Sequence, residues 1–220
     1  MPSKPMFLKQ ASLKSAPWAQ VTAILGIAVG TVGLALFLLV IPARVQAGGS
    51  LPGSILFYFS FFTILTNIGV VLTHISHIRP GAPLGWFRRP EIRGMFAALI
   101  FLVMVVYHLL LAKIWDPQGP LKLADIALHY AAPLIFIGWW VFFQPHRQLA
   151  YRMIPAMLAP PVLYNLYAMT RGAISGEYPY PFLEVNRLGY QVVGGNIVAL
   201  FLVVVALFCI VIAVDRRLHS

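Results

Sequence analysis

The chain has 220 residues, of which 60% are hydrophobic and only 10% carry a charge. A soluble domain of this length needs far more polar surface, so the composition excludes one and indicates a helical protein that crosses a membrane several times. The net charge of +10 does not indicate nucleic-acid binding, because the basic residues lie between the apolar stretches and in the tails, where they encode membrane topology.

Six apolar stretches predict an all-α fold, with residues 1–220 forming a single integral membrane domain. Each stretch is close to the roughly 20 residues that cross a bilayer. The predicted helices cover about 19–41, 54–76, 91–113, 122–144, 149–171 and 191–214. The single cysteine, Cys209, lies in the last of them, so an intrachain disulfide is impossible.

Lysine and arginine predict the orientation of these helices. Eleven of the 16 basic residues lie on the side that holds both termini, and five lie on the opposite side. Because cytoplasmic loops are enriched in Lys and Arg, both termini are predicted to be cytoplasmic. The larger group comprises Lys4, Lys9, Lys14, Arg79, Arg88, Arg89, Arg93, Arg147, Arg152, Arg216 and Arg217, and the smaller group comprises Arg44, Lys113, Lys122, Arg171 and Arg187.

The second predicted helix carries polar residues that a bilayer disfavours. Ser60, Thr63 and Asn67 share one helix face, and Thr66 lies on the neighbouring face. Such residues commonly hydrogen-bond between membrane helices, so a packing stripe is the simplest interpretation.

A pair of histidines, His74 and His77, lies at the inner end of the same helix. Without a third ligand nearby, we interpret it as a solvated interfacial pair rather than a metal site.

The third and fourth predicted helices carry intramembrane histidines. Asp125 and His129 are four residues apart, so their side chains can meet, and the carboxylate can fix the imidazole tautomer. Asp125 alternatively complements the helix N-terminus or pairs with Lys122. At a rise of 1.5 Å per residue, Thr63, His108 and His129 lie about 13, 8 and 10 Å below the outer surface. These depths predict one buried polar site in the outer half of the membrane.

The fifth predicted helix contains Pro155, Pro160 and Pro161, which favour a bent helix. The outer loop that follows it is rich in aromatic residues and proline. We predict that this loop forms a lid or pocket rim, with an interfacial aromatic belt as the alternative. Its candidate residues are Tyr178, Tyr180, Phe182 and Glu184.

Three short motifs occur in order along the chain: "FTILTN", "LHYAAP" and "YPYPFLE". Together they resemble the androgen-induced-gene family of multi-pass membrane hydrolases and its bacterial six-pass relatives. The resemblance covers about residues 55–200. It implies a threonine hydrolase that cleaves fatty acid esters of hydroxy fatty acids, within an integral membrane protein of a bacterial inner membrane.

Carried over to this sequence, the resemblance implies Thr63 as the nucleophile and His129 as the base. The family has an acidic residue three positions after its threonine, where this chain has Thr66. Because this departure leaves the register of the alignment open, Thr66 is the alternative nucleophile. Asn67, Thr66 and His108 are candidate oxyanion donors, and Asp125 is a candidate support for His129. The expected substrate is a lipid or fatty-acyl ester, reached through membrane lipids.

Two further classes of function remain open from the sequence. A non-catalytic transporter, receptor or sensor would use the same buried polar residues to bind a ligand or to move protons. A structural subunit of a larger complex would use them only for packing. We expect no metal and no other cofactor, because the sequence has no phosphate-binding loop, no paired-carboxylate metal site and no haem-attachment pattern.

Overall fold

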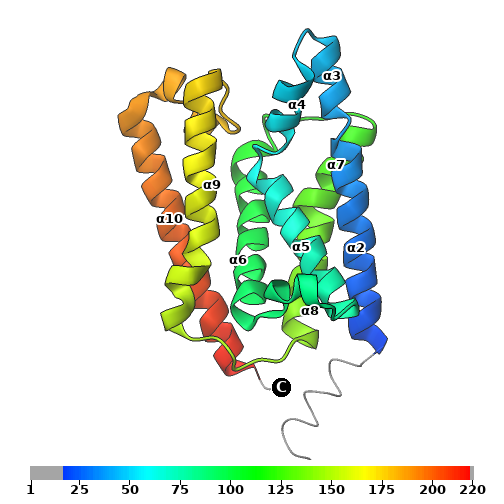
Figure 1. Cartoon of the computed structure of the whole chain (residues 1–220). Coiled ribbons are helices and arrows are strands. Elements are labelled where there is room, and N and C mark those ends of the chain that lie inside the picture. Colours follow the sequence, from blue (N-terminus) through cyan, green and yellow to red (C-terminus); the bar gives the residue numbers. More distant parts are fainter. Residues whose placement is uncertain (1–16, 219–220) are drawn as a thin grey trace, which may run out of the picture.

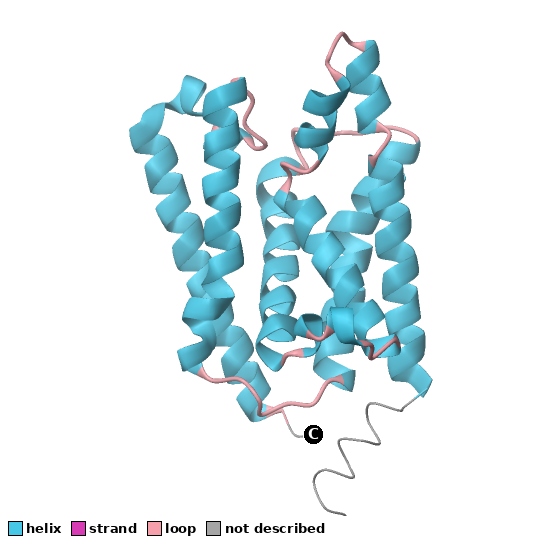
Figure 2. Ribbon diagram, viewed as in Figure 1, coloured by secondary structure: helices cyan, strands magenta, loops and turns pink. Residues whose placement is uncertain are grey.

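The computed structural model describes residues 17–218, and this part of the chain is helical without any strand (Figure 2). The all-α prediction is therefore confirmed for the described residues. Lys4, Lys9 and Lys14 lie outside them. The α-helices are α2 (Pro17–Phe37), α3 (Val40–Gln46), α4 (Leu51–Tyr58), α5 (Phe62–Ile78), α6 (Pro90–Val106), α7 (Pro120–Ile126), α8 (Ala132–Phe143), α9 (Ile154–Ser175) and α10 (Val185–Arg217).

Two π-helical turns interrupt this pattern. Tyr107–Leu111 continues α6, and Ala127–Ala131 joins α7 to α8. Short 3-10 turns make up Ala82–Leu84, Trp86–Arg88, Tyr151–Met153 and the turn η6 (Pro181–Leu183). A π-helical turn adds one residue to a helical turn and is frequent at functional sites.

Four helical stretches among the described residues are long and apolar enough to cross a membrane. They are Pro17–Gln46, Pro90–Leu111, Pro120–Phe143 and Val185–Arg217. The bent pair α4 and α5 adds a fifth if it counts as one span. Helix α9 has 22 residues and runs unbroken through Pro160 and Pro161, but it is not among the apolar candidates. The structure thus supports a membrane protein with four to five candidate spans.

The predicted continuous helix 54–76 is wrong, because α4 and α5 meet at an angle of 66°. The chain leaves the helical conformation at Phe61, whose φ and ψ are −82° and 127°. Two side chains satisfy the backbone groups that the break exposes. The Ser60 hydroxyl donates to the Phe57 carbonyl at 2.7 Å, and the Tyr164 hydroxyl donates to the Ser60 carbonyl at 2.9 Å. The break therefore places Thr63 in the first turn of α5.

Helix α5 lies against α2, α6 and the segment that joins α7 to α8, while α9 and α10 run side by side at the far edge of α6 (Figure 1). The core between these helices is apolar and includes the fully buried Met95, Phe136, Trp139 and Phe208. The helices α3 and α4 rise at the same end of the bundle as the loop between α9 and α10, whereas the start of α2 and the end of α10 lie at the other end. The predicted site residues of α5 thus lie in the half toward α3 and η6.

His74 is fully buried, so our interpretation of it as part of a solvated pair is wrong. Its ring packs edge-on against Phe136 and Trp139, because α2 presents glycine at the point of contact. No group of three or more His, Cys, Asp or Glu side chains able to hold a metal ion occurs within residues 17–218.

Substituting Gly26 with alanine should destabilise the fold. A Cβ atom at Gly26 would lie 2.3 Å from Nε2 of His74, and the aromatic rings around His74 leave it no room to move. Overpacking of this kind costs about 1–3 kcal/mol. Thermal unfolding in detergent measures the loss. Gly138→Ala is the matched control, because nothing lies within 4 Å of the Cβ that it adds; equal midpoints for both variants would contradict the packing.

Candidate active site

The structure brings Thr63 of α5 and His129 of the π-helical turn together across 66 residues of sequence. The Thr63 hydroxyl oxygen Oγ1 lies 3.4 Å from Nε2 of His129. Both residues are largely buried, with Thr63 8% exposed and the His129 side chain 13% exposed. This distance is within reach of a hydrogen bond, and such contacts often shorten when a substrate binds.

Asp125 determines the orientation and the tautomer of the His129 imidazole. The ring nitrogen Nδ1 lies 3.0 Å from the backbone carbonyl oxygen of Asp125 and 3.1 Å from its carboxylate Oδ1. Nδ1 therefore carries the proton and donates it to the backbone carbonyl oxygen of Asp125, while the nearby carboxylate faces the ring without accepting a hydrogen bond. The lone pair of Nε2 then faces the Thr63 hydroxyl. This arrangement can take a proton from Thr63 and can stabilise the imidazolium that results.

Tyr107, which sequence reasoning missed, completes the support of this pair. Its hydroxyl donates to Asp125 Oδ2 at 2.6 Å, and its ring stacks on the His129 ring at a centroid distance of 3.7 Å. Tyr107 begins one π-helical turn and His129 lies in the other, so the two irregular turns meet at the site. In the sequence, only the neighbouring residue His108 stands out as a polar side chain within the apolar stretch.

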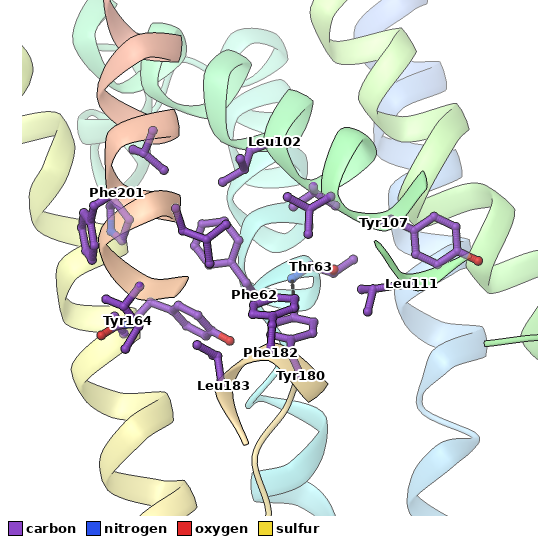
Figure 3. Close-up of a pocket in the computed structure, with 17 residues that line it drawn as sticks. Phe62, Thr63, Leu102, Tyr107, Leu111, Tyr164, Tyr180, Phe182, Leu183 and Phe201 are labelled. Carbon is purple, nitrogen blue, oxygen red and sulfur yellow. Dashed lines mark hydrogen bonds between the residues drawn. The ribbon is translucent and has the colours of Figure 1, made fainter. Parts of the chain in front are cut away.

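Tyr180 reaches the site from the loop between α9 and α10. The Tyr180 hydroxyl accepts a hydrogen bond from the backbone N–H of Thr63 at 3.4 Å, and the Tyr180 ring stacks on the ring of Phe182 (Figure 3). Burial raises the pKa of Tyr180, so the phenol keeps its proton at neutral pH. The hydroxyl is therefore a hydrogen-bond donor beside the Thr63 side chain. Tyr180 and Phe182 thus lie where residues of a pocket rim should, beside Thr63.

Asn67 and Thr66 lie on α5 without facing the reacting groups. The Asn67 amide donates to the carbonyl oxygens of Thr63 and Leu128, at 2.8 and 3.2 Å, which ties α5 to the π-helical turn. Thr66 is buried, and its hydroxyl has no hydrogen-bond partner among the described residues. The geometry therefore selects Thr63 over Thr66 as the residue that His129 can reach, and it gives Asn67 a positioning role.

Three other residues predicted for the site lie away from it. His108 is exposed, and its Nδ1 lies 3.2 Å from the Tyr130 hydroxyl. Tyr178 packs against Gly172 of α9. Glu184 precedes α10 and forms an ion pair with Arg187 at 3.6 Å. None of the three lines a cavity that contains Thr63.

Glu177, at the start of the loop between α9 and α10, connects that loop to its neighbours. Arg44 of α3 contacts its carboxylate at 2.8 Å and Arg171 of α9 at 3.0 Å. The hydrogen bond from Arg44, aided by Arg171, lowers the pKa of Glu177 below its ordinary range. Both ion pairs are partly exposed, so each contributes little to stability by itself. Together they hold the loop that carries Tyr180 against α3 and α9.

Thr63 lies on the wall shared by two apolar cavities. The first lies among α6, α9 and α10 and has a volume of about 90 Å³ (Figure 3). The second, of about 270 Å³, is lined by α3, α4, α7 and the His129 turn. A hydroxyl and an imidazole are thus surrounded by surfaces suited to hydrocarbon chains.

Comparison of the chain with family models, with curated proteins and with solved structures finds no match.

Proposed function

We propose that this protein is a membrane-embedded lipid ester hydrolase, with Thr63 as the nucleophile and His129 as the general base. The observation that carries the proposal is the 3.4 Å approach of Thr63 Oγ1 to His129 Nε2, with Nδ1 of the ring held by Asp125. The resemblance based on "FTILTN" and "LHYAAP" selects the same two residues without any use of distance. The apolar cavities on either side of Thr63 support a lipid as the substrate.

The reaction proceeds in two halves that share one base. Nε2 of His129 takes the proton of the Thr63 hydroxyl while Oγ1 attacks the ester carbonyl carbon. The carbon–oxygen bond to the alcohol then breaks, and His129 gives its proton to the leaving alkoxide. Water attacks the resulting acyl-threonine, with its proton passing to His129, and the second bond cleavage releases the fatty acid and returns the proton to Thr63.

The oxyanion of each tetrahedral intermediate needs hydrogen-bond donors. The backbone N–H of Thr63 and the hydroxyl of Tyr180, which lie 3.4 Å apart beside the nucleophile, are the candidate donors. The N–H lies in the first turn of the 17-residue helix α5, where the helix dipole favours negative charge. The break between α4 and α5 thereby gives the site an anion-stabilising helix end.

We further propose that the chain crosses the membrane six times and that both of its termini lie in the cytoplasm. The membrane would be the inner membrane of a bacterium. In this topology α4 and α5 make one bent span, and α9, which packs beside α10, makes the sixth. The placement of the start of α2 and the end of α10 at one end of the bundle supports this topology (Figure 1). The reacting groups then lie in the outer half of the membrane, where a lipid ester can enter sideways.

Purified protein in lipid nanodiscs, given a fatty-acyl ester of a long-chain alcohol, tests the proposal. We expect the wild type and Thr66→Val to release fatty acid, detected by mass spectrometry, and Thr63→Ala to release none. Thr66→Val is the matched control because it removes a neighbouring buried hydroxyl from the same helix. Absence of hydrolysis by the wild type, with transport of a ligand into vesicles that Thr63→Ser leaves intact, would instead establish the transporter class.

A further inference from the structure

The two cavities that meet at Thr63 differ in whether the imidazole of His129 lines them. They share the four residues Thr63, Tyr107, Leu111 and Tyr180. His129 and Asp125 line only the larger one, which we call the His129 cavity and which also contains Phe37, Val40 and Leu128. The smaller one, which we call the α10 cavity, is lined by Ile197, Leu200, Phe201 and Val204 of α10, together with Tyr164 (Figure 3).

The position of His129 assigns the two halves of the substrate. A general base that has taken the nucleophile's proton must deliver it to the leaving alkoxide, so the alcohol half must depart on the imidazole side. The acyl half stays on Thr63 Oγ1 and must extend away from the imidazole. We propose that the α10 cavity binds the acyl chain and the His129 cavity binds the alcohol chain, an assignment that rests on the proposed hydrolysis at Thr63.

Cavity size adds a second constraint. The α10 cavity has a volume of about 90 Å³ and the His129 cavity about 270 Å³, so the α10 cavity is the more restrictive of the two. The enzyme should therefore be selective for the length of the acyl chain. It should tolerate a longer or branched chain in the alcohol half.

Both cavities offer hydrocarbon walls and few polar groups. The α10 cavity is lined by aliphatic and aromatic side chains, with Asn165 and the hydroxyls of Thr63, Tyr107, Tyr164 and Tyr180 as its polar side chains. The substrate class is thus an ester with an apolar chain on both sides of the carbonyl. A charged headgroup in the alcohol half would have to extend beyond the His129 cavity.

Two series of esters measure the assignment, one with acyl chains of increasing length on a fixed alcohol and one with alcohol chains of increasing length on a fixed acyl group. Leu200→Trp fills the α10 cavity and Val40→Trp fills the His129 cavity, whereas Phe201→Ala and Phe37→Ala enlarge them. Leu202→Trp is the control, because Leu202 is 66% exposed and lines neither cavity. Size-exclusion elution and thermal midpoints verify the folding of each variant.

We expect Leu200→Trp to lower kcat/KM for the longer acyl chains by about ten-fold or more and to keep the wild-type order across the alcohol series. Val40→Trp should do the reverse, and each enlarging variant should shift its own series toward longer chains. Leu202→Trp should follow the wild type in both series.

A crossed result, in which Leu200→Trp changes the alcohol series, would overturn the assignment. So would equal effects of both variants on both series. If Thr63→Ala and His129→Ala stop hydrolysis in either of these cases, the proposed function stands and only the assignment fails. If the wild type hydrolyses neither series, the proposed function fails and this assignment fails with it.

Discussion

Replacing both Thr63 and His129 with alanine is expected to lower ester hydrolysis no further than replacing either residue alone. The two side chains act on one proton, since Thr63 Oγ1 lies 3.4 Å from His129 Nε2, and neither can work without the other. Loss of one member of such a pair costs about 10³- to 10⁶-fold in kcat, and such losses are not additive. Steady-state hydrolysis by the wild type, the two single variants and the double variant measures this.

The double-variant comparison has an internal control for damage to the fold. Asn67→Ala removes the amide that joins α5 to the carbonyl of Leu128, so it should lower kcat while leaving some turnover. Additive losses in the double variant would contradict the shared proton, because additivity is the behaviour of independent sites. Hydrolysis by His129→Ala at the wild-type rate would likewise show that His129 is not the general base.

Replacing Asp215 with alanine is expected to have the largest effect on stability. Asp215 is buried near the end of α10, and its Oδ2 accepts the backbone N–H groups of Gln148 and Leu149 at 2.9 and 2.8 Å. Nδ1 of His146 lies 3.3 Å from the other carboxylate oxygen. The substitution strands two buried donors and removes the charge that faces a buried imidazole, at a cost of about 3–5 kcal/mol.

Thermal unfolding in detergent measures this cost, with Asp116→Ala as the matched control. Asp116 is also an aspartate in an ion pair, with Lys122 at 3.5 Å, but its side chain is 82% exposed. Exposed pairs contribute about 0–1 kcal/mol, so the control should unfold almost as the wild type does. Similar midpoints for the two variants would show that Asp215 does not anchor α10 to the segment between α8 and α9.

The sequence predicted the helices well where hydropathy alone decides the boundary. The predicted helix 91–113 corresponds to Pro90–Leu111, and 122–144 corresponds to Pro120–Phe143. It missed the break before Phe62, because that break depends on the Tyr164 hydroxyl reaching the Ser60 carbonyl from 104 residues away. No local pattern in "FYFSFFT" carries that information.

The same reasoning applies to the site. Thr63, Asp125 and His129 stand out because polar side chains inside apolar runs are rare. Tyr107 does not, because tyrosine is common in membrane helices and its role depends on a π-helical turn. Asp215 and His146 were also missed, because charged residues near helix ends are ordinary marks of topology. Their pairing across 69 residues becomes visible only in the fold.

Trapping the acyl-enzyme tests whether Thr63 is the nucleophile and His129 is its base. The protein is mixed with an excess of an activated fatty-acyl ester, quenched before the steady state and digested, and the acylated peptide is sequenced by mass spectrometry. We predict that the acyl group is attached to Thr63 and that His129→Ala abolishes the adduct. An adduct on Thr66 or on another residue, or an adduct on Thr63 that forms as fast without His129, would contradict it.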